Sequence, residues 1–124
     1  MTVSIRTLKN KVIIDIHSYK LDGGIVPVLR KTIIDLIEKG FSNILINFSL
    51  INSLSSEALG CLISAHKKCL RKKGELCLFG MKNDILAIFF VIQLDEYLKL
   101  YSCENDALNR TNPLIKRRFK VVRR

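Results

Sequence analysis

The sequence predicts an α/β protein: a four- to five-stranded mixed, mostly parallel sheet with helices packed largely on one side. Two observations carry this prediction. Strand-like apolar runs alternate with helical patterns roughly every 15 residues, an order typical of a parallel sheet. The chain of 124 residues, 48% of them hydrophobic, is also long enough for one domain with a buried core.

The chain opens with a predicted hairpin. Residues 3–8 and 12–16 are short and rich in β-branched residues, and the polar residues 9–11 between them suit a turn. The second segment is almost unbroken in its apolar residues, which is typical of a strand covered on both faces. Leu21-Asp22-Gly23-Gly24 ends this pattern, and we expect Asp22 and the glycines to supply the turn and the N-cap of the next helix.

Helices and strands alternate through the rest of the chain. Pro27 suits the first turn of the first helix, and Gly40 follows its last turn, where C-cap glycines belong. A second helix with an apolar stripe begins near Ala58 and ends at Gly74. The remaining expected elements are strands at 44–48, 75–79 and 98–101, a helix capped by Asn83 or Asp84 that runs through Gln93, and a brief helix at 104–108.

Catalytic and metal-binding patterns are absent from the sequence. It contains neither a Gly-rich phosphate-binding motif nor an HExxH motif, and its two histidines, His17 and His66, are far apart. His66 falls among lysines, so we expect it in solvent. The four cysteines form no CxxC pair, and we expect Cys61, Cys69 and Cys77 to be small buried residues. We therefore expect no enzymatic activity, metal, cofactor or small-molecule substrate.

Two features bear on location. The longest apolar run, Ile85 to Ile92, is eight residues, well short of the ~20 that a membrane-spanning helix needs. The N-terminal segment has no secretory-signal pattern. We therefore expect a cytoplasmic protein without a membrane span and with reduced thiols.

The net charge of +10 is concentrated near the C-terminus. Seven basic residues and no acid lie between Arg110 and Arg124, which leaves the other 109 residues with a net charge of only +3. We therefore expect a domain over residues 1–109 and a basic C-terminal tail over 110–124. The tail could contact an acidic partner, or its apolar residues could dock on the domain. Specific nucleic-acid recognition is not expected, because the domain has little excess charge and no reader motif.

The stretch Ser53-Leu54-Ser55-Ser56-Glu57-Ala58-Leu59-Gly60 precedes the apolar stripe of the second helix. Ser55 suits the N-cap position, and Glu57 suits the positive end of the helix dipole. The same place would tolerate a phosphate, because free N–H groups and the dipole favour an added anion. From the residues alone, a purely structural helix start and a regulatory serine both stay open.

The order of elements and this motif resemble the STAS domain, most closely the stand-alone bacterial anti-sigma factor antagonists. The resemblance spans about Val3 to Leu108 and includes the Leu21-Asp22 turn, the strand Asn43 to Phe48, SLSSEALGCLISAHKK, KKGELCLFG and LDEYLKLYSCENDAL. Family members usually carry an Asp-Ser-Ser-Gly-Leu-Gly type motif. Aligned on Leu59-Gly60, Ser56 takes the position that a partner serine kinase phosphorylates, and Ser55 is a rival acceptor if the register slips by one.

The resemblance implies a protein-binding switch. The unphosphorylated antagonist binds an anti-sigma factor that is also a serine kinase, and this binding frees a sigma factor. Phosphorylation by that kinase ends the binding, and a serine phosphatase restores it. We expect the partner surface to centre on two helix starts, comprising Leu21, Asp22, Gly23, Gly24, Ser53, Leu54, Ser55, Ser56 and Glu57. The alternative is a constitutive STAS scaffold or interaction module in another complex, with Ser56 only part of a helix start.

Three positions depart from the family pattern. Ser55 stands where the family usually has Asp, Glu57 where it often has a second Ser, and Ala58 where Gly is common. The missing carboxylate bears on recognition by the kinase, and Glu57 adds a permanent charge beside the acceptor. Weak phosphorylation or a different regulation would follow from either change.

Overall fold

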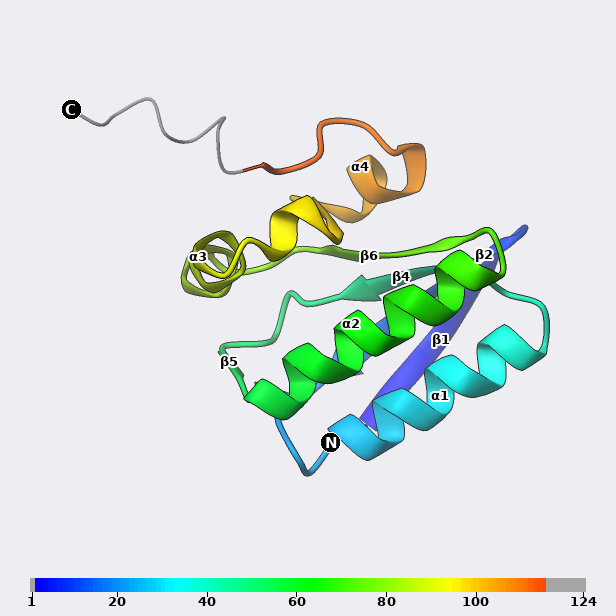
Figure 1. The fold of residues 1–124 in the computed structure, drawn as a ribbon, viewed down its shortest axis with the longest axis horizontal. Helices are drawn as coiled ribbons and strands as arrows, with labels where there is room; N and C mark the ends of the chain where they lie inside the picture. The colour runs from blue at the N-terminus through cyan, green and yellow to red at the C-terminus, as the bar shows by residue number, and fades with distance from the viewer. Residues whose placement is uncertain (1, 116–124) are drawn as a thin grey trace.

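The computed structural model describes residues 2–115. Within this range the main sheet has five strands in the order β1-β2-β4-β6-β7, which run over Thr2–Leu8, Lys11–His17, Asn43–Asn47, Glu75–Phe79 and Lys99–Tyr101. β1 pairs with β2 antiparallel, and the remaining pairings in this sheet are parallel (Figure 1). The predicted mixed, mostly parallel sheet and its opening hairpin are confirmed.

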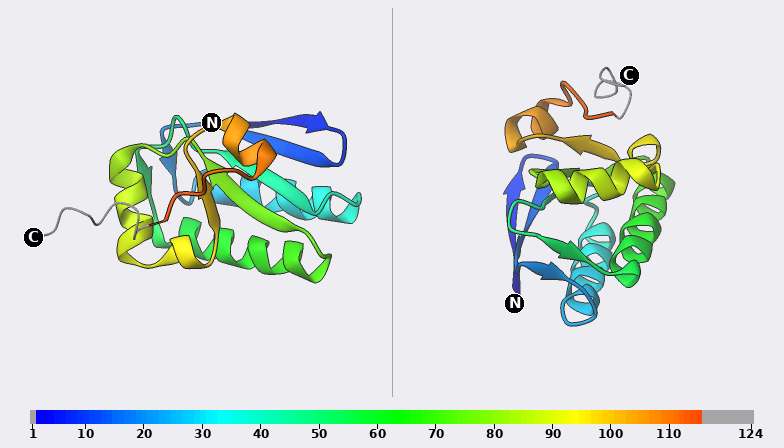
Figure 2. Two further views of the ribbon diagram at one scale, coloured as in Figure 1. Left: turned by 90° about the horizontal axis from the view of Figure 1, so that it is seen from above. Right: turned by 90° about the vertical axis from the view of Figure 1, so that its left-hand side faces the viewer.

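Helices cover both faces of the sheet unequally. α1 (Val26–Glu38), α2 (Ser56–Arg71), α3 (Asn83–Val91) and the short 3₁₀ helix η1 (Leu94–Glu96) pack on the larger core, and α4 (Glu104–Asn109) packs on the opposite face (Figure 2). Ile44 and Ile46 of β4 belong to the larger core, whereas Leu45 between them packs with Ala107 of α4. A parallel strand covered on both faces buries every side chain, which explains the almost continuous apolar runs of β2 and β4.

A second, smaller sheet is present that the sequence patterns did not indicate. β3 (Lys20–Leu21) pairs parallel with β5 (Ser53–Leu54), with Lys20 opposite Ser53 and Leu21 opposite Leu54. Strands of two residues are too short to show an alternating pattern. β3 lies just before α1 and β5 just before α2, so the packing of these two helices on the sheet brings the two strands together.

Two predicted helix caps are wrong. The N-cap of α1 is Ile25, and Asp22 contributes its carbonyl oxygen, which accepts the N–H groups of Ile25 and Val26 at 3.0 and 2.8 Å. The N-cap of α3 is Lys82, so neither Asn83 nor Asp84 caps that helix. α3 ends at Val91 rather than at Gln93, because Gln93 has a left-handed backbone (φ 62°) that cannot continue a helix.

His66 is buried, which corrects the expectation that it lies in solvent. It follows Leu62 by four residues, so it continues the buried stripe of α2 rather than the row of lysines. The Leu76 N–H donates to His66 Nδ1 at 3.2 Å, and the imidazole packs edge-on against Tyr97 with ring centroids 5.0 Å apart. Burial lowers the pKa of His66 below its ordinary value of 6.5, although Glu75 nearby opposes this shift.

The buried imidazole makes stability depend on pH. Because the pKa of His66 is lower in the folded state, the unfolded chain takes up a proton first as the pH falls below about 6.5. We expect the free energy of unfolding to drop with a slope of at most about 1.4 kcal/mol per pH unit in that range. Urea denaturation at pH 7.5 and 5.5 measures the effect. The His66→Gln variant, which does not titrate, should lose most of the pH dependence; an unchanged dependence would contradict this prediction.

The first residues of the expected tail contact the domain. Arg110 forms an ion pair with Glu75 (3.4 Å) and donates to Asn43 Oδ1 at 3.0 Å. The Leu114 N–H donates to the Leu100 carbonyl oxygen at 2.7 Å, and Leu114 packs against the larger core. The rest of the tail, residues 116–124, lies outside the described residues. Over residues 2–115, no helix is both long enough and apolar enough to cross a membrane.

Candidate functional site

The pairing of β3 with β5 brings two loops together where two helices start. The Ser55 N–H donates to the Leu21 carbonyl oxygen at 3.0 Å, and the Asn52 N–H donates to that of Tyr19 at 2.8 Å. As a result, α1 and α2 start at the same end of the molecule, beside β5 (Figure 1). The segments 21–24 and 53–57, expected to form one surface, therefore lie side by side.

Asp22 organises the loop before α1. Its Oδ1 accepts the N–H of Gly24 at 3.0 Å, while its carbonyl oxygen accepts the first N–H groups of the helix. A Cβ atom built on Gly23 would lie 3.2 Å from Glu57 Oε1, so the Glu57 side chain reaches from the start of α2 to this loop. Leu21 is fully buried, so it supports this loop from below while Asp22, Gly23 and Gly24 face outward.

The start of α2 assigns different roles to its two serines. Ser55 is the N-cap, as predicted: it has an extended backbone, and its Oγ accepts the Ala58 N–H at 3.1 Å. Ser56 is the first helical residue and is exposed, and its Oγ makes no hydrogen bond to any residue of the range 2–115. Glu57, also exposed, is the acidic residue of the first turn. The hydroxyl of Ser56 is therefore available to another protein, whereas that of Ser55 is engaged.

The capping role of Ser55 predicts a loss of stability when its hydroxyl is removed. Ser55→Ala leaves the Ala58 N–H without its side-chain acceptor, and we expect the free energy of unfolding to fall by about 1 kcal/mol. Ser56→Ala is the matched control, since it removes the neighbouring hydroxyl without removing a hydrogen bond, and it should leave stability nearly unchanged. Urea denaturation of both variants tests the assignment, and equal losses would refute it.

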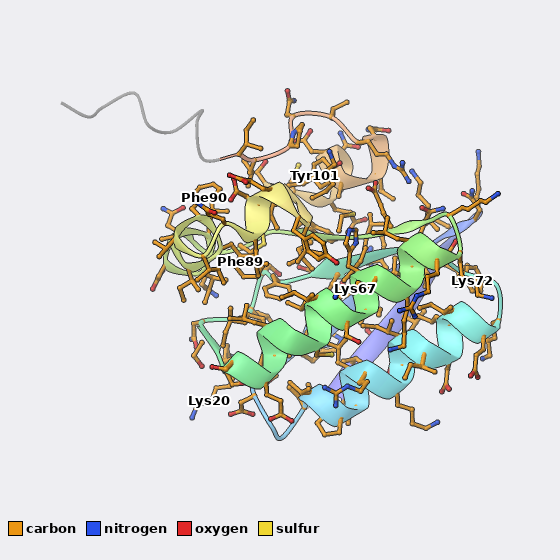
Figure 3. The ribbon with its side chains drawn as sticks, in the orientation of Figure 1. Lys20, Lys67, Lys72, Phe89, Phe90 and Tyr101 are labelled. Carbon is orange, nitrogen blue, oxygen red and sulfur yellow. The ribbon has the colours of Figure 1, made fainter. Side chains whose placement is uncertain are left out.

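A groove adjoins this site along β3. It has a volume of about 420 Å³ and is lined by His17, Ser18, Tyr19, Lys20 and Leu50. Tyr19 and Leu50 are 66% and 41% exposed. Figure 3 shows Lys20 beside the N-terminal end of α2. The sequence did not point to Tyr19 or Leu50 as surface residues of a site. Leu50 is exposed and the adjacent Ile51 is buried, and two neighbouring apolar residues in a loop have no periodic pattern that would tell them apart.

The residues of this site are suited to binding another protein. Within the described part of the chain, no group of three or more His, Cys, Asp or Glu residues could hold a metal ion. The charged side chains of the paired segments 20–24 and 53–57 are Lys20, Asp22 and Glu57. The positive end of the α2 dipole lies at Ser56, the first residue of that helix. The arrangement can present a hydroxyl to a partner and accommodate an anion in its place.

Residues 2–107 match the family model of the STAS domain, so the chain belongs to the STAS domain family. Its fold is that of solved antagonist structures. An anti-sigma factor antagonist from Mycobacterium paratuberculosis aligns with a TM-score of 0.78 at 19% identity, over 88% of this chain and 92% of that one. The anti-sigma factor antagonist SpoIIAA of Bacillus, in its unphosphorylated form, aligns with a TM-score of 0.75 at 19% identity, over 88% and 95%.

The same fold also occurs in a different setting. A sulfate transporter family protein from Wolinella succinogenes aligns with a TM-score of 0.71 at 15% identity, over 85% of this chain and 87% of that one. No curated protein sequence matches the chain. Identities this low establish a common fold, so the function has to be argued from the site.

Proposed function

We propose that this chain is an anti-sigma factor antagonist that acts as a phosphorylation-controlled protein-binding switch. When unphosphorylated, it sequesters an anti-sigma factor that is also a serine kinase. The observation that carries the proposal is the exposed Ser56 hydroxyl at the start of α2, directly beside the loop of residues 21–24. Membership of the STAS family and the likeness to solved antagonists support it.

The site favours Ser56 over Ser55 as the phosphoacceptor. Ser55 is half-buried and its Oγ accepts the Ala58 N–H, so a phosphate there would disrupt the cap of α2. The Oγ of Ser56 has no such role, and the residue is exposed. In the proposed step, the kinase transfers the γ-phosphoryl group of ATP to Ser56 Oγ, the hydroxyl proton is released and ADP leaves. A serine phosphatase then hydrolyses the ester with water and restores the hydroxyl.

A phosphate on Ser56 would change recognition while the fold persists. It would add nearly two negative charges at the N-terminus of a 16-residue helix, where free N–H groups and the dipole favour an anion. It would also stand beside Glu57 and across the paired loops from Asp22, so the surface would become strongly acidic. A partner surface complementary to a neutral hydroxyl would then bury uncompensated charge, and binding would end.

The proposed partners are therefore proteins of the cytoplasm: the anti-sigma factor kinase and a serine phosphatase. The chain supplies the acceptor hydroxyl and the surface of residues 21–24 and 53–57. The proposal needs no catalytic group, cofactor, small-molecule substrate, membrane span or specific nucleic acid from this chain.

Phosphorylation by the partner kinase tests the proposal. Incubation with kinase and ATP should add the mass of one phosphate to the wild-type chain, read by intact mass spectrometry. Ser56→Ala should take up none. Ser55→Ala, although less stable, should still be phosphorylated, because its Ser56 hydroxyl remains. Undiminished phosphate in Ser56→Ala, or none in the wild type, would contradict the switch.

The second candidate is a constitutive STAS scaffold or interaction module. Two observations favour it: Glu57 already places a permanent carboxylate beside the acceptor, and Ser55 replaces the family's usual Asp. On this alternative, the kinase adds no phosphate and the charge at position 56 has no effect on binding.

A further inference from the structure

The outer face of α3 is apolar and exposed. Ile88, Val91 and Ile92, spaced so that they share one side of the helix and its C-cap, are 39%, 76% and 46% exposed. On the inner side, Ile85 and Phe89 are buried in the larger core, where the rings of Phe89 and Phe48 pack edge-on with centroids 6.1 Å apart. A helix that is apolar on both sides is ordinarily covered on both. Ile88, Val91 and Ile92 together form the outer face of α3.

The segment that carries this face is acidic, although Lys82 and Lys99 border it on either side and one of its acids, Asp95, is buried. From Asn83 to Leu98 the sequence contains the acids Asp84, Asp95 and Glu96 and no lysine or arginine. Asp84 in the first turn of α3 and Glu96 in η1 are both exposed. The segment therefore fits an occupant that combines apolar side chains with positive charge.

Residues 116–124 of the same chain have this composition. The sequence Lys-Arg-Arg-Phe-Lys-Val-Val-Arg-Arg contains six basic residues, three apolar residues and no acid. The residues just before this segment also lie close to α3. Leu114 is hydrogen-bonded to Leu100 of β7, and η1 contacts both β7 and α3. The ten residues after Leu114 can span up to about 33 Å when extended, well over the ~14 Å length of a nine-residue helix.

We propose that residues 116–124 dock on the outer face of α3. Phe119, Val121 and Val122 supply the apolar cover for Ile88, Val91 and Ile92, and the basic residues between them lie near Asp84 and Glu96. The tail is then an internal ligand of the domain, and its positive charges are engaged by the chain itself instead of by an external acidic partner. This inference is independent of the proposed switch at Ser56.

A spin label on the tail of the full chain tests the docking. Lys120→Cys is labelled in a Cys103→Ser background, since Cys103 is the exposed thiol of the described residues. Cys61, Cys69 and Cys77 are buried, as predicted, and burial raises the pKa of Cys69 to about 11 and that of Cys77 to about 12, so they should remain unlabelled. We expect the NMR amide signals of residues 87–92 to be lost through paramagnetic broadening, while those of α1 persist.

Matched variants separate docking from other causes. Val91→Lys places a cation on the outer face of α3 and should restore the lost signals. Val28→Lys makes the same change at a 44% exposed valine of α1 and should leave the broadening in place. Failure of the label to broaden residues 87–92 selectively would overturn the proposal. Broadening of an isotope-labelled chain by a separate spin-labelled chain would also overturn it, because a second copy would then be the occupant.

Discussion

Replacing Ser56 with glutamate should weaken binding to the partner kinase by about 100-fold or more, which corresponds to about 3 kcal/mol. The substitution puts a permanent negative charge where the unphosphorylated chain presents a neutral hydroxyl, next to Glu57. A charge buried in an interface without a partner costs several kcal/mol, and the loss should appear mainly as faster dissociation. Surface plasmon resonance or calorimetry with the purified kinase measures it.

The matched control is Ser64→Glu, which adds the same charge farther along α2. Ser64 is exposed and its Oγ accepts from Lys68 Nζ at 3.3 Å, so a glutamate there faces the same lysine. We expect its affinity for the kinase to equal that of the wild type and both variants to keep the wild-type circular dichroism spectrum. If Ser56→Glu binds as tightly as Ser64→Glu, the constitutive scaffold is the better account of this protein.

Replacing Gly74 with alanine should destabilise the fold by about 3 kcal/mol or more. Gly74 is buried in the turn between α2 and β6, where its N–H donates to the Cys69 carbonyl oxygen at 2.9 Å. A Cβ atom built there would clash with the carbonyl oxygen and the carbonyl carbon of Ser42. Both are backbone atoms in the loop before β4, so the clash can be relieved only by moving the turn or that loop.

Gly60, inside α2, provides the opposite case. Nothing is within 4 Å of a Cβ atom built on it. Gly60→Ala should therefore raise stability by up to about 1 kcal/mol, because alanine is the better helix former. Urea denaturation midpoints of the two variants should move in opposite directions. An unchanged or raised midpoint for Gly74→Ala would show that the close approach of Gly74 to Ser42 is not what constrains this turn.

Local patterns were sufficient for most of the architecture and for the N-cap of α2. The apolar runs of β2, β4 and β6 and the stripes of α1 and α2 reflect burial within single elements, so they can be detected along the chain. Ser55 could be assigned as the cap because the hydrogen bond spans only three residues. The choice of Ser56 as a phosphoacceptor came from the motif around Leu59-Gly60, and the exposure of its hydroxyl is consistent with it.

The sequence by itself thus determined the type of the main sheet, the order of its strands and the four α-helices along the chain, and the cap of α2, because each depends on neighbouring residues. Only the tertiary structure decided which distant segments meet. It paired Leu21 with Leu54, buried His66 against Leu76 and Tyr97, and placed Tyr19 and Leu50 beside one groove. These contacts join residues far apart in the chain, and their geometry depends on how helices and strands pack, which no local pattern of residue types records.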